Sequence, residues 1–139
     1  MRPFPALVVA LSGLSFCSCQ PEKDKPVEKE AAEVSKPKHP WDWKPTEANL
    51  VAGREIYVAE CSGCHNEGEE GAPSLLDQKS WQKREAKGLT VLLDHAINGY
   101  QGPSGEMPAR GGTPSLSDEE VTNAVNYILA SQKFHSNNN

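Results

Sequence analysis

The stretch Cys61-Ser62-Gly63-Cys64-His65 decides how the rest of this 139-residue sequence is interpreted. It places two thiols three positions apart and follows the second thiol at once with an imidazole. Two such thiols can add to the two vinyl groups of a haem, while the imidazole ligates the iron. Ser62 and Gly63 are small and permit a close approach of the chain to a flat ring. The spacing therefore predicts covalent haem attachment at Cys61 and Cys64, with His65 as an axial ligand.

Three other kinds of site fit a pair of cysteines at this spacing. A structural zinc site uses four ligands, and no second cysteine pair follows residue 20. A thioredoxin-like redox pair expects a βαβ setting, which the helical periodicity of this sequence does not indicate. A simple disulfide suits an oxidising compartment but gives His65 no role. Haem attachment is the interpretation that uses all three side chains.

A second axial ligand would decide between an electron carrier and a catalyst, and Met107 is the main candidate. Apart from the initiator Met1 it is the only methionine, and it lies in a loop rich in Gly and Pro. A thioether opposite an imidazole raises the reduction potential of the iron and leaves no open coordination position. The rival ligands are His39, His95 and His135, and the alternative role for Met107 is that of flexible core filler.

The sequence after residue 45 indicates helices joined by long loops, so we expect an all-α domain. Helical spacing of apolar residues predicts helices over residues 47–60, 79–86, 90–98 and from 117 onward. Ser117 and Glu120 form a capping-box pattern that predicts where the last helix begins. The loops 66–76 and 101–116 are rich in Gly and Pro, and no strand alternation of useful length is present. The apolar residues are few for such long loops, which favours a bound apolar group at the centre.

These features together resemble the class I c-type cytochromes, and in particular the small bacterial cytochrome c-five group. The resemblance covers about residues 46–132. It implies a small cytochrome c fold in which the N- and C-terminal helices cross and wrap around one covalently attached haem. At the crossing an aromatic residue of the last helix, Tyr127 here, packs on a glycine of the first helix, Gly53 here. Only glycine lets two helix backbones approach so closely.

The resemblance also implies roles for residues outside the attachment stretch. Pro73 lies in a segment that resembles the loop whose proline carbonyl accepts the N–H of the axial His65, which would fix the orientation of its ring. Trp81 and Arg84 resemble residues of a helix near the haem propionates, with ordinary packing and a solvated charge as the alternative. The segment 107–112 resembles the family's methionine loop.

The N-terminal sequence indicates export. Residues 6–16 form an apolar run that is too short to span a bilayer but is typical of a secretory signal. We expect a signal peptide over residues 1–18. Cys17 and Cys19 at its end resemble the acylated cysteine of a bacterial lipoprotein signal. Cleavage by an ordinary signal peptidase, without a lipid, is the alternative.

Three further segments are expected beyond the signal peptide. Residues 19–45 are rich in Lys, Glu and Pro and carry few large apolar side chains, so we expect a disordered tether. The cytochrome c domain is expected over residues 46–134, and residues 135–139 are expected to form a disordered tail. An acyl anchor followed by a long tether would suit a carrier that moves between membrane partners.

The charge is mildly acidic, with 14 Lys and Arg against 19 Asp and Glu, and the acidic excess lies after residue 45. This balance argues against nucleic-acid binding and favours a positively charged docking partner. We expect a monomeric, periplasmic or cell-envelope one-electron carrier with a His/Met-ligated haem c, which exchanges electrons with donor and acceptor proteins and catalyses no reaction itself. The alternatives are a haem-bearing subunit of a larger oxidoreductase, or a haem-based sensor or peroxidase if Met107 does not ligate iron.

Overall fold

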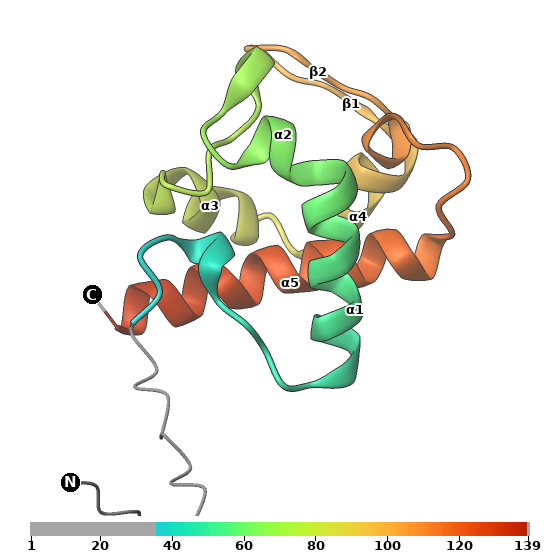
Figure 1. Ribbon diagram of the computed structural model, residues 1–139. Helices are drawn as coiled ribbons and strands as arrows, with labels where there is room; N and C mark the ends of the chain where they lie inside the picture. The colour runs from blue at the N-terminus through green and yellow to red at the C-terminus, as the bar shows by residue number, and fades with distance from the viewer. Residues whose placement is uncertain (1–35, 139) are drawn as a thin grey trace, which may run out of the picture. The chain divides into compact units, whose positions relative to one another are not determined.

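The computed structural model describes residues 36–138 (Figure 1). The predicted signal peptide of residues 1–18, including Cys17 and Cys19, lies outside the described residues, as does the expected tether up to residue 35. None of the described helices is both long enough and apolar enough to cross a membrane.

The expected all-α architecture is confirmed, and each predicted helix is present within two residues of its predicted start. The helices are α1 (Ala48–Ile56), the π turn η2 (Tyr57–Cys61), α2 (Ser62–His65), α3 (Gln78–Glu85), α4 (Leu89–Asn98) and α5 (Asp118–Asn137). Three 3₁₀ turns accompany them: η1 (Pro40–Asp42), η3 (Glu69–Gly71) and η4 (Ala109–Gly112). The capping box before α5 is confirmed, since the Ser117 hydroxyl accepts the amide N–H of Glu120 and the Glu120 carboxylate accepts that of Ser117.

A short antiparallel ladder lies where the sequence indicated only a loop. Strand β1 (Tyr100–Gln101) pairs with β2 (Glu106–Met107), with Tyr100 opposite Met107. Strands of two residues are too short to produce a visible alternation of apolar and polar residues. The tip of this hairpin touches η3, because a Cβ at Gly71 would overlap with the backbone carbonyl of Ser104. The loop that follows His65 and the tip of the hairpin that carries Met107 are therefore in backbone contact.

The first and last helices cross, as the resemblance implied (Figure 1). Gly53 of α1 is buried at the crossing, and a Cβ there would overlap with the backbone carbonyl of Asn123 in α5. Tyr127 lies one turn further along α5, with its ring 5.3 Å from that of Tyr57. The glycine is thus packed against the α5 backbone at Asn123 and Ala124. Its lack of a side chain is what allows the close approach.

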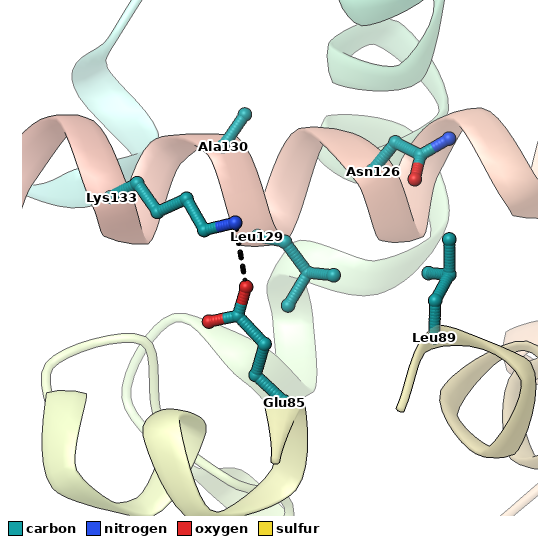
Figure 2. Close-up of a pocket in the computed structure, with 6 residues that line it drawn as sticks. All are labelled: Glu85, Leu89, Asn126, Leu129, Ala130 and Lys133. Carbon is teal, nitrogen blue, oxygen red and sulfur yellow. Dashed lines mark ion pairs between the residues drawn. The ribbon is translucent and has the colours of Figure 1, made fainter. Parts of the chain in front are cut away.

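Helix α5 also contacts α3 and lies beside the start of α4. A shallow hollow between these elements is lined by Leu89 and Leu129 among others, and Lys133 pairs with Glu85 across it at 2.7 Å (Figure 2). Both side chains of this ion pair are well exposed, so the pair contributes little to stability.

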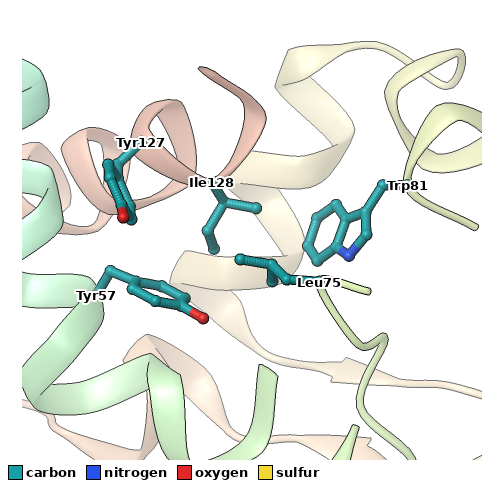
Figure 3. Close-up of a cluster of buried hydrophobic side chains, with 5 residues drawn as sticks. All are labelled: Tyr57, Leu75, Trp81, Tyr127 and Ile128. Carbon is teal, nitrogen blue, oxygen red and sulfur yellow. The ribbon is translucent and has the colours of Figure 1, made fainter. Parts of the chain in front are cut away.

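The core consists of two small clusters on either side of Leu129, which packs against both. The first cluster contains Tyr57, Leu75, Trp81, Tyr127 and Ile128 (Figure 3). The second contains Ala96, Val121 and Val125, with Met107 partly buried against it. Clusters of this size agree with the small number of apolar residues in the sequence.

The expectation of a disordered tether is wrong for its last residues. Trp43 stacks on Tyr127 at 6.0 Å and on Phe134 at 5.3 Å between ring centroids. The Tyr127 hydroxyl donates to the carbonyls of Trp41 and Trp43, at 3.1 and 3.2 Å. The prolines and charges of this segment conceal the large apolar surface of its two tryptophans, which is sufficient to hold it against α5.

The expected domain of residues 46–134 is consequently too short at both ends. Pro40 in η1 is fully buried, and α5 continues to Asn137 through most of the expected tail. The packed part of the described chain therefore begins before the first predicted helix and ends with the last one.

Replacing Gly53 tests the helix crossing. In Gly53→Ala the new methyl group would meet the backbone of Asn123, so we expect the free energy of unfolding to fall by about 1–3 kcal/mol. The matched control is Val51→Ala in the same helix, because the Val51 side chain is exposed. Denaturant titration of both proteins measures the difference, and equal midpoints would contradict the close crossing.

Removing the Tyr127 hydroxyl tests the packed N-terminal segment. Tyr127→Phe deletes the donor to the Trp41 and Trp43 carbonyls and should lower the free energy of unfolding by about 1 kcal/mol. Tyr100→Phe is the control, since Tyr100 is exposed and its hydroxyl makes no hydrogen bond within residues 36–138. If both variants unfold like the unmodified protein, the segment does not depend on this contact.

Candidate functional site

The attachment stretch lies on a continuous helix in which a π turn ends at the first cysteine. The amide N–H of Ser62 donates to the carbonyl of Tyr57, five residues earlier, and α2 then carries the chain to His65. Single π turns within helices occur frequently at functional sites. Cys61 is partly buried and Cys64 is exposed, and no disulfide bond joins them.

The electrostatics of Cys61 do not suit a redox-active thiol pair. Burial raises the pKa of the Cys61 thiol to about 11, and the neighbouring Glu60 and Cys64 add to the rise. Redox-active and nucleophilic cysteines instead have a lowered pKa, because the thiolate is the reactive form. The direction of this shift does not favour the thioredoxin-like interpretation.

His65 is buried and held by the contact that the resemblance implied. Its Nδ1 lies 3.1 Å from the Pro73 carbonyl oxygen. A carbonyl can only accept, so Nδ1 carries the proton and Nε2 is left as the atom with a free lone pair. Burial lowers the pKa of His65; the Pro73 hydrogen bond opposes this, and the Arg84 charge adds to the lowering. The site therefore favours a neutral imidazole, which is the form that ligates metals.

Trp81 anchors the loop that supplies the Pro73 carbonyl. Its indole Nε1 donates to the Ser74 carbonyl at 2.8 Å, and the Ser74 hydroxyl donates to the Asn66 carbonyl at 2.9 Å. The Trp81 ring lies tilted beside His65, with centroids 6.0 Å apart. Trp81 is thus a buried packing residue with one well-placed donor, close to the His65 imidazole.

Arg84 makes its hydrogen bonds within its own helix. Its guanidinium donates to the Ser80 carbonyl at 3.0 Å and also to the Ser80 hydroxyl. The charge is near enough to lower the pKa of His65. A role toward haem propionates stays a prediction.

Met107 lies in β2, partly buried against the second core cluster. Two of the rival imidazoles stack on aromatic rings. His95 stacks on Tyr100 at 3.8 Å, His39 stacks on Trp41 at 4.6 Å, and His135 lies in the last turn of α5.

Sequence reasoning missed several residues that shape the site. The Tyr57 hydroxyl donates to the Asn66 side chain, and Gln132 Nε2 donates to the Leu75 carbonyl at 2.6 Å. Arg110 bridges from η4 to α5. Asn66 could have been singled out by its place directly after His65. Gln132 and Arg110 carry no local signal, because their partners are distant in sequence or are backbone carbonyls.

The residues present fit a covalently attached haem. Two unpaired thiols stand at the required spacing, and a neutral imidazole is oriented through its Nδ1. Such an outer hydrogen bond accompanies most metal-bound histidines and raises the basicity of the ligand. Within the described residues, no three His, Cys, Asp or Glu side chains gather as they would around a metal ion bound by the protein alone.

Comparisons with known proteins agree with this fit. The family described as "Cytochrome C oxidase, cbb3-type, subunit III" matches residues 48–128. Cytochrome c-555 of Chlorobaculum thiosulfatiphilum is 44% identical over 85 residues, which cover 61% of this chain and 99% of that protein. Cytochrome c6 of Gracilaria tenuistipitata var. liui is 31% identical over 84 residues, with 59% of this chain and 72% of that protein covered.

A solved structure is also similar. It is a chain of the crystal structure of an electron transfer complex of nitrite reductase with cytochrome c. The TM-score is 0.51 at 32% sequence identity, and the match covers 58% of this chain and 94% of that chain.

Changing Trp81 tests how the Pro73 loop is held. Trp81→Phe keeps an aromatic ring but removes the donor to the Ser74 carbonyl, so the free energy of unfolding should fall by about 1–3 kcal/mol. Arg84→Gln, one turn along the same helix, should change it by less than about 0.5 kcal/mol, because its partners lie within that helix. Denaturant titration followed by far-UV circular dichroism provides the measurement. A larger loss in Arg84→Gln than in Trp81→Phe would show that the loop depends on the charge instead.

Proposed function

This chain belongs to the class I c-type cytochromes, and from that premise we propose that it is a one-electron carrier whose iron is held between His65 and Met107. Members of this family carry one covalently bound haem c, whose iron supplies the chemistry by cycling between the ferric and ferrous states. The similarity to proteins named cytochrome c-555 and cytochrome c6 supports electron transfer and no bond-making reaction.

The observation that carries the proposal is the hydrogen bond from His65 Nδ1 to the Pro73 carbonyl, on the same helix as two cysteines that no disulfide joins. It orients the imidazole and leaves Nε2 free to act as a ligand. Cys61 and Cys64 tether the group to the same helix, so that attachment and ligation come from one rigid segment. A rigid site of this kind limits rearrangement when one electron is gained or lost.

Met107 is proposed as the second axial ligand on the strength of its place in the hairpin. Its strand pairs with Tyr100, and the hairpin tip touches η3 in the loop that leads to Pro73. The elements that hold the two proposed ligands are thus in direct contact. A thioether in this position would favour the ferrous state and exclude external ligands.

The description of the matching family as an oxidase subunit favours a second candidate, a haem-bearing subunit of a larger oxidoreductase. Purification of the native protein separates the two. A free carrier elutes at the size of a single small chain, whereas a subunit co-purifies in fixed stoichiometry with larger partners.

We also propose that the protein is exported to the periplasm or cell envelope and exchanges electrons with redox protein partners. The apolar run of residues 6–16 supports export. The acidic balance of the chain supports partners with a positive docking face. Attachment through an acyl group at Cys17 or Cys19 is an outcome that intact mass spectrometry of the mature protein would reveal.

The Met107→Leu variant tests the ligand set. Leucine keeps the bulk but offers no lone pair. We therefore expect loss of the weak ferric charge-transfer band at the red end of the spectrum, a lower reduction potential, and binding of carbon monoxide by the reduced protein. Absorption spectroscopy and potentiometry on the maturation-competent full chain provide the measurements.

The unmodified protein should show that band and should not bind carbon monoxide when reduced. If it lacks the band and binds carbon monoxide readily, the result favours a haem-based sensor or peroxidase. A colourless product, with Cys61 and Cys64 free or bonded to each other by mass, would overturn the proposal as a whole.

A further inference from the structure

One side chain in the turn after Met107 reaches out of its loop onto the last helix. Arg110 lies in η4, and its Nη1 donates to the Leu116 carbonyl at 2.8 Å. Its Nη2 donates to Asp118 Oδ1 at 2.6 Å, in the first turn of α5. The guanidinium thus closes the loop between β2 and α5 with two bonds from one planar group, a geometry that lysine cannot reproduce.

The backbone conformation at position 110 would suit glycine better than arginine. The presence of arginine is therefore explained by its side chain. Arg110 has φ 55° and ψ 32°, in the left-handed region that costs a residue with a side chain about 1 kcal/mol or more. Glycine would adopt this conformation without strain, as the following Gly111 does at φ 64°. An arginine here therefore offsets its backbone cost through the contacts of its guanidinium.

The same loop is tied to the attachment helix on its other side. The Thr113 hydroxyl donates to Glu60 Oε2 at 2.5 Å, and Glu60 directly precedes Cys61. The segment that follows Met107 is thus fastened both to the helix with the thiols and to α5. The hydrogen bond from Thr113 to Glu60 is a single contact at an exposed position. The two hydrogen bonds of Arg110 are therefore the stronger connection.

The exposed fractions of the two side chains indicate that both hydrogen bonds of the Arg110 guanidinium matter, and not the ion pair alone. The Asp118 side chain is 70% exposed, so the ion pair by itself would contribute little. The Arg110 side chain is only 25% exposed, and its second bond goes to a backbone carbonyl that fixes the end of the loop. Hydrogen bonds from a charged donor are roughly twice as strong as neutral ones.

We propose that Arg110 is a positioning residue for Met107, which keeps the methionine loop closed and so keeps the thioether on the iron. This inference rests on the proposed function, because it requires Met107 to be an axial ligand. Arg110 itself touches neither the iron nor a redox partner in this role. Its effect is on the fraction of molecules in which the loop is open.

Added imidazole measures that fraction, because it can bind the ferric iron only when the thioether has left. Its apparent affinity is the intrinsic affinity multiplied by the fraction of open molecules. A variant that loosens the loop therefore binds imidazole more tightly, even if the rest of the domain is unchanged. A residue with a purely structural role would lower the unfolding midpoint and leave this affinity unaltered.

The experiment titrates the ferric full-length holoprotein with imidazole and follows the visible spectrum. We expect Arg110→Ala to bind imidazole about tenfold more tightly than the unmodified protein. Lys133→Ala is the matched control, since it removes the cation of a second ion pair on α5, with Glu85 (Figure 2). Lys133 lies near the opposite end of α5 from Asp118. The imidazole affinity of Lys133→Ala should equal that of the unmodified protein.

Two further variants separate the side chain from the backbone. Arg110→Gly relieves the left-handed strain and should still bind imidazole more tightly, because both guanidinium hydrogen bonds are lost. Asp118→Asn keeps the Leu116 bond and should show a smaller increase in the same direction, which tests the bridge even if Arg110→Ala fails to mature. Unchanged affinity in Arg110→Gly and Asp118→Asn would overturn the proposal.

Met107→Leu distinguishes this result from a failure of the proposed function. With no thioether to displace, this variant sets the upper limit of imidazole affinity. If the unmodified protein already binds at that limit, Met107 is not a ligand and both proposals fall. If it binds far below the limit while all Arg110 variants match it, only the role of Arg110 is refuted.

Discussion

The backbone contact between Gly53 of α1 and Asn123 of α5 is the constraint on which the remaining geometry depends. Because α1 runs through the π turn directly into α2, the crossing sets the position of both thiols and of His65 relative to α5. A side chain at Gly53 would push the helices apart and move the whole attachment stretch with it. The packing at this one contact therefore determines where the residues of the site lie.

Helix α5 then holds the two loops that approach the site from opposite ends of the helix. Near its N-terminus, Asp118 accepts from Arg110 and fastens the loop after Met107. Near its C-terminus, Gln132 donates to the Leu75 carbonyl and fastens the loop after Pro73. One twenty-residue helix thus supports the surroundings of both proposed axial ligands. A rigid support of this length suits a centre whose ligands must keep their positions as the charge changes.

The sequence was sufficient to predict those parts of the structure that rest on local signals. The Cys61–His65 stretch and the Ser117 capping box each depend on residues within a few positions of one another, and α2 and the start of α5 agree with them. The packed Trp43 segment escaped prediction because its partners lie more than eighty residues away. The Arg110 bridge escaped it because one of its acceptors is a backbone carbonyl, which any residue could supply.

The thin core and the proposed ligands are two aspects of the same arrangement. Within residues 36–138 the two apolar clusters share only Leu129. One contains Trp81, whose ring lies beside His65, and Met107 packs against the other. Each proposed ligand is thus packed against its own cluster, and α5 contributes residues to both. Neither cluster is large enough to stabilise a domain with such long loops alone. A covalently attached apolar group would therefore serve both as redox centre and as the missing part of the core, which explains why attachment chemistry and fold are encoded together in the helix that ends at His65.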